Sequence, residues 1–189
     1  MEIISKGRVM AGVRIATEND AAAVAGIYAP YVRDTAITFE EVAPSPSEIG
    51  GRIGRTLSTH PFLVFEDGCS VVAYAYASPH RERAAYRWSA DVAIYAAPEI
   101  HRRGVGRALY SCLLDILRRQ GFHSAFAGVT LPNANSIGLH EAMGFEHVAT
   151  YAEVGFKLGS WHDVGWWQCR IASGPPCGAP IAFPDLRVT

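Results

Sequence analysis

A short segment rich in arginine and glycine, His101-Arg102-Arg103-Gly104-Val105-Gly106, has the composition of a phosphate-binding loop. It leads into residues 104–120, whose apolar side chains recur at helical spacing. The first N–H groups of a helix lack internal partners and its dipole adds partial positive charge, so this end attracts anions. Because Gly104 and Gly106 have no Cβ, a phosphate can approach the backbone closely. We therefore expect a pyrophosphate here; the alternative is an ordinary helix start with solvated arginines.

Two common nucleotide-binding patterns do not fit this loop. The phosphate loop of P-loop enzymes requires GxxxxGK[ST], and that string is absent from the chain. The dinucleotide fingerprint requires a third glycine, and Leu109 stands in its place. Coenzyme A is therefore the better ligand for the segment.

Longer stretches of the chain resemble the GNAT superfamily of N-acetyltransferases, whose loop reads Q/R-x-x-G-x-G/A, with His101 here in the leading position. The resemblance extends to the phosphinothricin and methionine sulfoximine acetyltransferase group. It rests on the sequences Ala-Tyr-Arg-Trp at 85–88, Leu-Pro-Asn at 131–133 and His-Asp-Val-Gly-Trp-Trp-Gln at 162–168, and it spans about residues 13–171. It implies transfer of the acetyl group of acetyl-CoA to the α-amine of a small amino-acid analogue, by direct attack in a ternary complex.

The resemblance also implies how acetyl-CoA is held. Backbone groups of a splayed strand bind the pantetheine, and the 101–106 loop binds the pyrophosphate. The start of a later helix, predicted at 133–143, also binds the pantetheine arm. The implied residues are Ala93, Ile94 and Tyr95 on the strand, His101, Arg102, Arg103, Gly104, Val105 and Gly106 in the loop, and Asn133 and Ser136 on the helix. His101 puts only one side-chain contact of this set in question.

Asp91 is the candidate general base. An amine must lose its proton before it attacks, and a positioned carboxylate removes it directly or through water. On a strand over residues 88–95, alternation places Asp91 on the same face as Ala93 and Tyr95. The related group usually has Glu here, and the shorter Asp favours a bridging water. The alternative is a surface ion pair at a strand end.

His140 is the second catalytic candidate. Many superfamily members place a Tyr that protonates the departing thiolate at this position, and the subgroup has a His. His140 could donate that proton, or orient Asp91 or the substrate. The alternative is a structural histidine beside an apolar helix face.

The acceptor site is assigned to two loops. Arg81, Arg83 and Tyr86 precede the Asp91 strand, and arginine binds carboxylates bidentately. Phe39 and Glu40 follow the first helix, in a loop that borders the acceptor site in the superfamily. The alternative is a pair of solvated loops.

Composition excludes several other functions. The formal net charge of −1, without a long basic run, argues against nucleic-acid and anionic-membrane binding. No segment approaches the roughly 18 apolar residues of a membrane span, and no secretory h-region is evident at the N-terminus. The four cysteines have no metal-ligand spacing, and His162-Asp163 has no third ligand, so we expect no metal. A cytoplasmic enzyme with reduced thiols is expected.

The elements that position these residues alternate between strands and helices. Strands are predicted at 13–16, 62–65, 70–77, 88–95, 124–130, 145–154 and 164–171, and helices at 21–32, 47–57, 104–120 and 133–143, with Pro30 bending or ending the first helix. This order predicts an α/β, single-domain GNAT fold with a mixed, mostly antiparallel twisted sheet flanked by helices. Residues 1–12 form an N-terminal extension, 13–172 the N-acetyltransferase domain, and 173–189 a loosely attached Pro-rich tail.

Two further functions remain as alternatives. The chain could acetylate another amine, such as a protein N-terminus or a small metabolite, or it could be a non-catalytic acyl-CoA-binding sensor. The presence of both Asp91 and His140 argues against the sensor. Trp161, Trp166 and Trp167 are most simply core or interface residues. If their side chains are exposed together, they would suit the homodimer contact that the resemblance implies.

Overall fold

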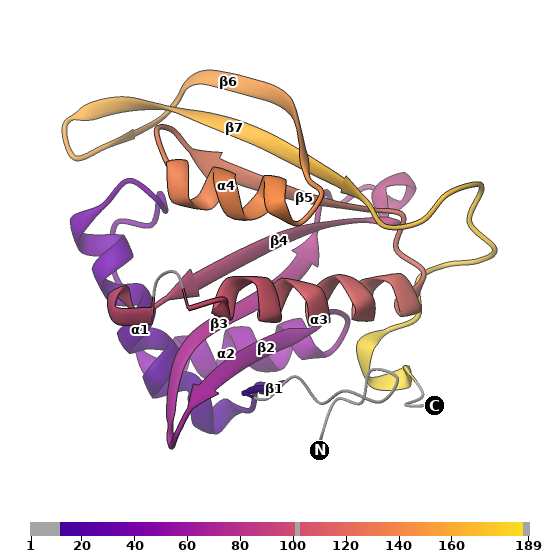
Figure 1. Cartoon of the computed structure of the whole chain (residues 1–189), viewed down its shortest axis with the longest axis horizontal. Coiled ribbons are helices and arrows are strands. Elements are labelled where there is room, and N and C mark those ends of the chain that lie inside the picture. Colours follow the sequence, from indigo (N-terminus) through magenta and orange to yellow (C-terminus); the bar gives the residue numbers. More distant parts are fainter. Residues whose placement is uncertain (1–11, 101–102, 187–189) are drawn as a thin grey trace.

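A twisted seven-stranded sheet runs through the protein in the order β1-β2-β3-β4-β5-β7-β6 (Figure 1). The computed structural model describes residues 12–100 and 103–186. Neighbouring strands are antiparallel except β4 and β5, which run parallel. The strands are β1 (Val13–Ile15), β2 (Phe62–Asp67), β3 (Ser70–Pro79), β4 (Ser89–Ala96), β5 (Ser124–Thr130), β6 (Glu146–Lys157) and β7 (Ser160–Arg170).

Two pairs of helices cover the two faces of this sheet. Helices α3 (Val105–Gln120) and α4 (Ala134–Ala142) lie in front of it in Figure 1. Helices α1 (Ala21–Asp34) and α2 (Pro46–Leu57) pack against the other face. The predicted mixed, mostly antiparallel sheet flanked by helices is therefore confirmed. None of the described helices has the length and apolar character of a membrane span.

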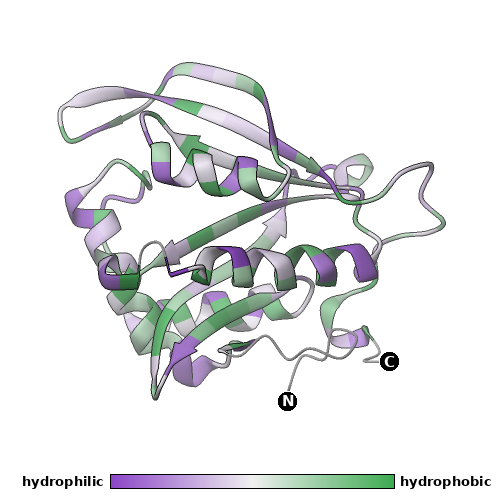
Figure 2. Cartoon of the chain, viewed as in Figure 1, coloured by the Kyte–Doolittle hydropathy of each residue, from purple (hydrophilic) through white to green (hydrophobic). Residues whose placement is uncertain are grey.

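The strands in the middle of the sheet are largely apolar (Figure 2), and their side chains pack into a core on each side of the sheet. On β3, Ala73, Ala75 and Ala77 face α3, whereas Tyr74 and Tyr76 face α1 and α2. The alternation follows from the two-residue period of a strand, and the small alanines let α3 lie close to the sheet. On β4, Ala90 and Val92 belong to the α3 side. Asp91, Ala93 and Tyr95 therefore lie on the α1–α2 face.

Two segments differ from the predicted elements. Helix α1 continues through Pro30 to Asp34, and the buried Val32 keeps its last turn packed on the sheet. Strand β7 begins at Ser160, because β6 and β7 join in a two-residue turn. In that turn Leu158 has φ 52° and Gly159 has φ 77°, the conformation that a tight hairpin needs.

The proline-rich tail is anchored on the body of the protein rather than loosely attached. Trp88 Nε1 donates a hydrogen bond to the Gly178 carbonyl at 2.7 Å. Gln120 Nε2 donates to the Ile181 carbonyl at 2.7 Å, and the Ile181 N–H donates back to the Gln120 carbonyl at 2.8 Å. These contacts lie at the C-terminal end of α3, the opposite end from the predicted phosphate loop.

Candidate active site

The start of α3 has the backbone geometry expected of an anion site. Gly104 is the N-cap and has φ +78°, a left-handed conformation that favours glycine. Ala108 is the first residue whose N–H bonds back, to the Gly104 carbonyl, so the amides before it have no partner within the helix. A Cβ on Gly106 would lie 2.9 Å from Leu139 Cδ2 of α4. His101 and Arg102 lie outside the described residues.

The charge that Arg103 brings to this loop is shared with a neighbouring turn. Its guanidinium donates to Asp67 Oδ2 at 2.8 Å, at the end of β2. The contact is exposed, so it contributes little to stability. It ties the loop to the β2–β3 hairpin, and the side chain is turned toward Asp67 in this structure.

Strands β4 and β5 separate beside the start of α3. They pair only from Ser89 to Asp91 on β4 and from Ser124 to Phe126 on β5. Beyond these residues β4 continues to Ala96 without a strand partner on its β5 side, and this stretch contains Ala93, Ile94 and Tyr95. An unpaired strand edge next to unpaired helix amides fits an extended amide-bearing chain that ends in a pyrophosphate. The residues present therefore fit acetyl-CoA.

The start of α4 supplies the remaining predicted cofactor contacts. Asn133 is the N-cap, and its Oδ1 accepts a hydrogen bond from the Ser136 N–H at 3.2 Å. This bond is the usual helix-capping interaction. Its side-chain NH₂ donates no hydrogen bond within the described ranges, and it remains a donor for a ligand.

Asp91 is half-buried and is bonded to a histidine that the sequence reasoning did not assign to the site. His80 Nδ1 lies 2.6 Å from Asp91 Oδ1. The His80 ring stacks on Phe126 with the centroids 4.4 Å apart and meets the Trp166 ring edge-on at 6.0 Å. Burial raises the pKa of the Asp91 carboxyl above its ordinary value, and the hydrogen bond from His80 acts in the opposite direction.

The residues predicted to bind an acceptor carboxylate divide into two groups. Arg81 lies over the Trp166 ring at 5.7 Å, and Tyr86 lies 6.0 Å from the His80 ring. The structure therefore brings both beside Asp91, whereas Arg83 is simply exposed. The buried Trp166 Nε1 has no hydrogen-bond partner among the described residues, which leaves a further donor at this place.

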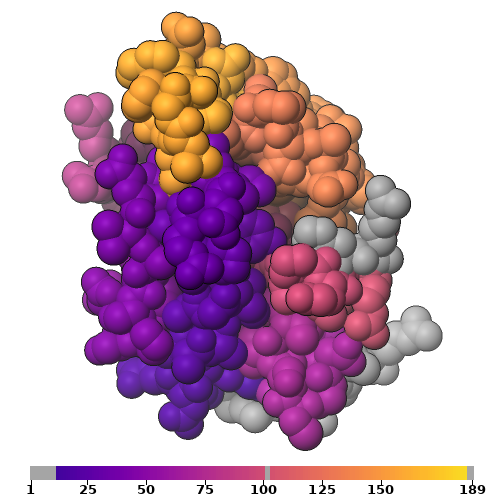
Figure 3. Space-filling view, turned by 90° about the vertical axis from the view of Figure 1, so that its left-hand side faces the viewer, coloured from indigo at the N-terminus to yellow at the C-terminus, as the bar shows by residue number. Residues whose placement is uncertain are grey.

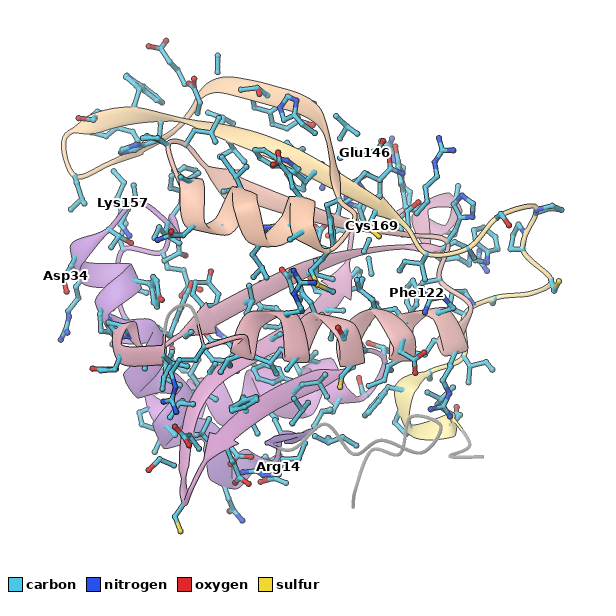
Figure 4. The ribbon with its side chains drawn as sticks, viewed as in Figure 1. Arg14, Asp34, Phe122, Glu146, Lys157 and Cys169 are labelled. Carbon is cyan, nitrogen blue, oxygen red and sulfur yellow. The ribbon has the colours of Figure 1, made fainter. Side chains whose placement is uncertain are left out.

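The loop after α1 is tied to the β6–β7 hairpin by a buried lysine. Lys157 Nζ donates to the Thr38 carbonyl at 2.7 Å. Figure 4 shows Lys157 beside this loop, and Figure 3 shows the hairpin, in yellow and orange, meeting it. Phe39 packs onto Gly155 and lies 6.3 Å from the His162 ring. These contacts fix the loop that contains Thr38 and Phe39 against the β6–β7 hairpin.

Glu40 is engaged in an ion pair rather than free to meet a ligand. Arg52 donates to both carboxylate oxygens, at 2.6 and 2.9 Å, and the Tyr28 hydroxyl donates at 3.1 Å. The Arg52 contacts lower the pKa of the Glu40 carboxyl. Tyr28 and Arg52 also line a cavity of about 170 Å³ between α1, α2 and the sheet.

His140 is buried and bonded at both ring nitrogens. Nδ1 lies 2.7 Å from the Ser136 carbonyl, which can only accept, so Nδ1 carries the proton. Nε2 then accepts from the Tyr110 hydroxyl at 2.9 Å. Burial lowers the pKa of His140, which keeps the ring neutral. Because His140 packs on the α3 side of the sheet and Asp91 faces the other side, the structure does not bring the two together.

The His162-Asp163 pair stabilises the hairpin. His162 Nε2 lies 3.0 Å from the Lys157 carbonyl, and Asp163 Oδ1 accepts from the Glu153 N–H at 2.8 Å. Glu153 has a positive φ of 48°, so the carboxylate bonds a residue in an unusual backbone conformation. Within residues 12–100 and 103–186, no cluster of three His, Cys, Asp or Glu side chains could hold a metal ion.

Comparison with known proteins agrees with this geometry. Residues 13–166 match the acetyltransferase (GNAT) domain family. The chain is 38% identical over 156 residues to a phosphinothricin N-acetyltransferase of Streptomyces viridochromogenes, covering 82% of this chain and 85% of that protein. It is 32% identical over 160 residues to an L-methionine sulfoximine/L-methionine sulfone acetyltransferase of Salmonella typhimurium, covering 84% and 94%.

A solved structure is similar over nearly the whole chain. It is a GNAT superfamily phosphinothricin acetyltransferase from Sinorhizobium meliloti in complex with acetyl-CoA, with a TM-score of 0.85 and 33% identity, covering 95% of this chain and 98% of that one. The family match and this likeness together identify the family of the chain. The chain is a member of the GNAT family of acetyl-CoA-dependent N-acetyltransferases.

Proposed function

We propose that the enzyme acetylates the α-amine of a small amino-acid analogue of the phosphinothricin or methionine sulfoximine type, by direct attack within a ternary complex. The observation that carries the proposal is the half-buried Asp91 carboxylate beside the open edge of β4, with Arg81 and the Trp166 ring close to its His80 partner. A carboxylate, a guanidinium and an aromatic wall match an α-amine, an α-carboxylate and a short side chain. The names of the relatives support the same substrate class.

Each group has a role in this reaction that follows from its place. The α3 amides and the β4 edge hold acetyl-CoA, which supplies the acetyl group as a thioester. The His80–Asp91 pair accepts the proton of the amine, and Arg81 binds the acceptor carboxylate. His140, in the last turn of α4 on the α3 side of the sheet, is the candidate proton donor for the departing thiolate.

The direct test measures thiol release from acetyl-CoA with a panel of amines. The panel contains phosphinothricin, methionine sulfoximine, methionine sulfone, ordinary amino acids and a peptide with a free N-terminus. We expect turnover with the analogues and much less with the peptide. Preference for the peptide would favour the protein N-terminus alternative. Binding of acetyl-CoA without release for any amine would favour the sensor.

We also propose a homodimer that uses the outer face of the β6–β7 hairpin. The edge strand β6, its turn and the start of β7 carry large apolar side chains that are 45–62% exposed, namely Val148, Tyr151, Val154, Phe156, Leu158 and Trp161. A contiguous exposed apolar surface of this kind favours an interface. Light scattering at micromolar concentration should give twice the chain mass, and a Trp161→Glu variant should give the monomer. A monomeric wild-type protein would exclude the dimer.

We place the enzyme in the cytoplasm. All four cysteines are free thiols in the structure, which fits a reducing compartment. Fractionation of cells that express the tagged chain tests this location.

A further inference from the structure

The histidine bonded to Asp91 has one ring nitrogen engaged and one nitrogen available. An ionised carboxylate only accepts hydrogen bonds, so the 2.6 Å contact with Asp91 places the proton of neutral His80 on Nδ1. Nε2 then carries a lone pair, and no described residue donates to it. The side chain is 13% exposed, so the ring is enclosed yet remains within reach of a ligand.

We propose that His80 Nε2 is the atom that takes the proton from the acceptor amine, and that Asp91 is the positioning residue that holds the imidazole in the correct tautomer. This inference rests on the proposed acetylation of an amine. It reverses the roles expected from the sequence, in which the Asp91 carboxylate itself is the base.

The surroundings of the ring fix its position from several elements. Phe126 of β5 supports one face of the ring, and the edge contacts come from Trp166 of β7 and from Tyr86. The titratable or charged groups that face the pair are Arg81 and Tyr86 on its own loop side, and Tyr76 across β3. Because Asp91 is the carboxylate in contact with the ring, it is the group that stabilises an imidazolium when one forms.

An imidazole suits the reaction better than the carboxylate behind it. Asp91 Oδ1 already accepts the Nδ1 proton of His80. A histidine, oriented by a carboxylate, is the arrangement that activates nucleophiles in other enzymes.

The proton and electron balance of the step is closed. The arriving ammonium gives one proton to His80 Nε2, and the amine lone pair forms a bond to the thioester carbonyl carbon. The C–S bond then breaks, its electron pair leaves on sulfur, and the second proton of the nitrogen passes to the thiolate. Solvent takes the proton from His80. The sum is R–NH₃⁺ plus acetyl-CoA giving R–NH–acetyl, CoA–SH and H⁺.

The decisive variant is His80→Asn. The asparagine NH₂ occupies the place of Nδ1 and can still donate to Asp91, but nothing replaces Nε2. With an amine that the wild-type enzyme acetylates, we expect kcat to fall about 100-fold or more. Acetyl-CoA affinity should be unchanged, and the acidic limb of the pH–kcat profile should disappear. A His80→Ala variant should recover activity when imidazole is added.

Two results would overturn the assignment. His80→Asn with wild-type kcat and an intact acidic limb would make His80 a support for Asp91 only. In the wild-type protein, ¹⁵N NMR of histidine that places the proton of neutral His80 on Nε2 would remove the lone pair on which the proposal depends. The NMR measurement needs no variant and no substrate. It therefore remains informative if no amine is acetylated, which is the separate failure of the proposed function.

Discussion

The buried hydrogen bond between Tyr110 and His140 allows the loss of unfolding free energy in a His140→Ala variant to be predicted. Tyr110 is fully buried and its hydroxyl donates to His140 Nε2 at 2.9 Å. His140→Ala leaves that hydroxyl without an acceptor, which costs about 1–3 kcal/mol. It also removes a ring that meets Phe145 edge-on at 5.2 Å, a contact worth about 0.5–1.5 kcal/mol. With some further loss of packing, we expect the unfolding free energy to fall by about 2–5 kcal/mol.

A double-mutant cycle separates the hydrogen bond from the packing. Tyr110→Phe leaves His140 Nε2 as a buried acceptor without a donor, and should cost about 1–2 kcal/mol. If the two groups are bonded, the double variant loses less than the sum of the single variants, by about 1–2 kcal/mol. Urea unfolding followed by tryptophan fluorescence measures all four proteins. Additive losses, within about 0.5 kcal/mol, would show that the hydrogen bond is not formed.

The same variants decide whether His140 takes part in catalysis. We expect His140→Ala to lower kcat while leaving acetyl-CoA affinity nearly intact, measured at a temperature where the variant is fully folded. Tyr110→Phe is the matched control, because it disturbs the same buried contact but keeps the imidazole. Wild-type turnover in folded His140→Ala would remove His140 from the mechanism and leave only its structural role.

Three further predictions concern the cofactor loop, the acid stability of the fold and the loop that contains Thr38, which is proposed to border the acceptor. Gly106→Ala places a Cβ 2.9 Å from a leucine of α4 and should weaken acetyl-CoA binding, measured by calorimetry, about 10-fold. Gly138→Ala is the control, because its Cβ meets open space. Equal acetyl-CoA affinities of the two variants would refute the reasoning. Burial lowers the pKa of His60 to about 4, below the ordinary value of about 6.5, so the unfolded chain binds more protons between these values. Stability present above pH 6.5 should therefore fall by about 1–3 kcal/mol as pH drops toward 4, and His60→Gln should flatten that dependence in urea titrations. Lys157→Met removes the hydrogen bond to the Thr38 carbonyl. It should raise the KM for the amine about fivefold or more without changing the KM for acetyl-CoA. An unchanged amine KM would show that the loop containing Thr38 does not contact the acceptor.

Local patterns were sufficient to predict the elements around the proposed cofactor site. The amphipathic spacing of residues 104–120 identifies α3, and Gly104 adopts the left-handed conformation that its glycine permits. Strand alternation places Asp91 with Ala93 and Tyr95 on one face, as the two cores of the structure confirm. These features depend on residues close in sequence, and their periods can be read directly.

Long-range pairing was not accessible in the same way. The ion pair of Glu40 with Arg52 joins a loop to α2, and the bond from Lys157 to Thr38 spans 119 positions. Neither has a sequence period, and each depends on where the helices and the hairpin pack. Glu40 was therefore assigned to the acceptor, whereas the structure shows it engaged with α2.

His80 shows which information was missing. It lies in a segment predicted as a charged loop, eleven positions before Asp91. The β3–β4 pairing sets Ser78 opposite Asp91 and Pro79 opposite Ala90, so His80 follows directly at the end of β3. A one-residue change in register would place the paired side chains on opposite faces. The contact between His80 and Asp91 is therefore a consequence of the β3–β4 register, which neither the hairpin prediction nor the composition of the loop specifies.

The register also gives a physical reason for the aspartate. From the family resemblance a longer glutamate is expected at this position, and the shorter side chain alone would act through water. Here the His80 ring lies 2.6 Å from the carboxylate and stacks on Phe126, so imidazole occupies the space into which a longer carboxylate would extend. Asp91→Glu should consequently displace His80 rather than improve the base. In the proposed mechanism the His80 ring, bonded to the short Asp91 carboxylate, extends toward the amine in place of the methylene that Asp lacks relative to Glu.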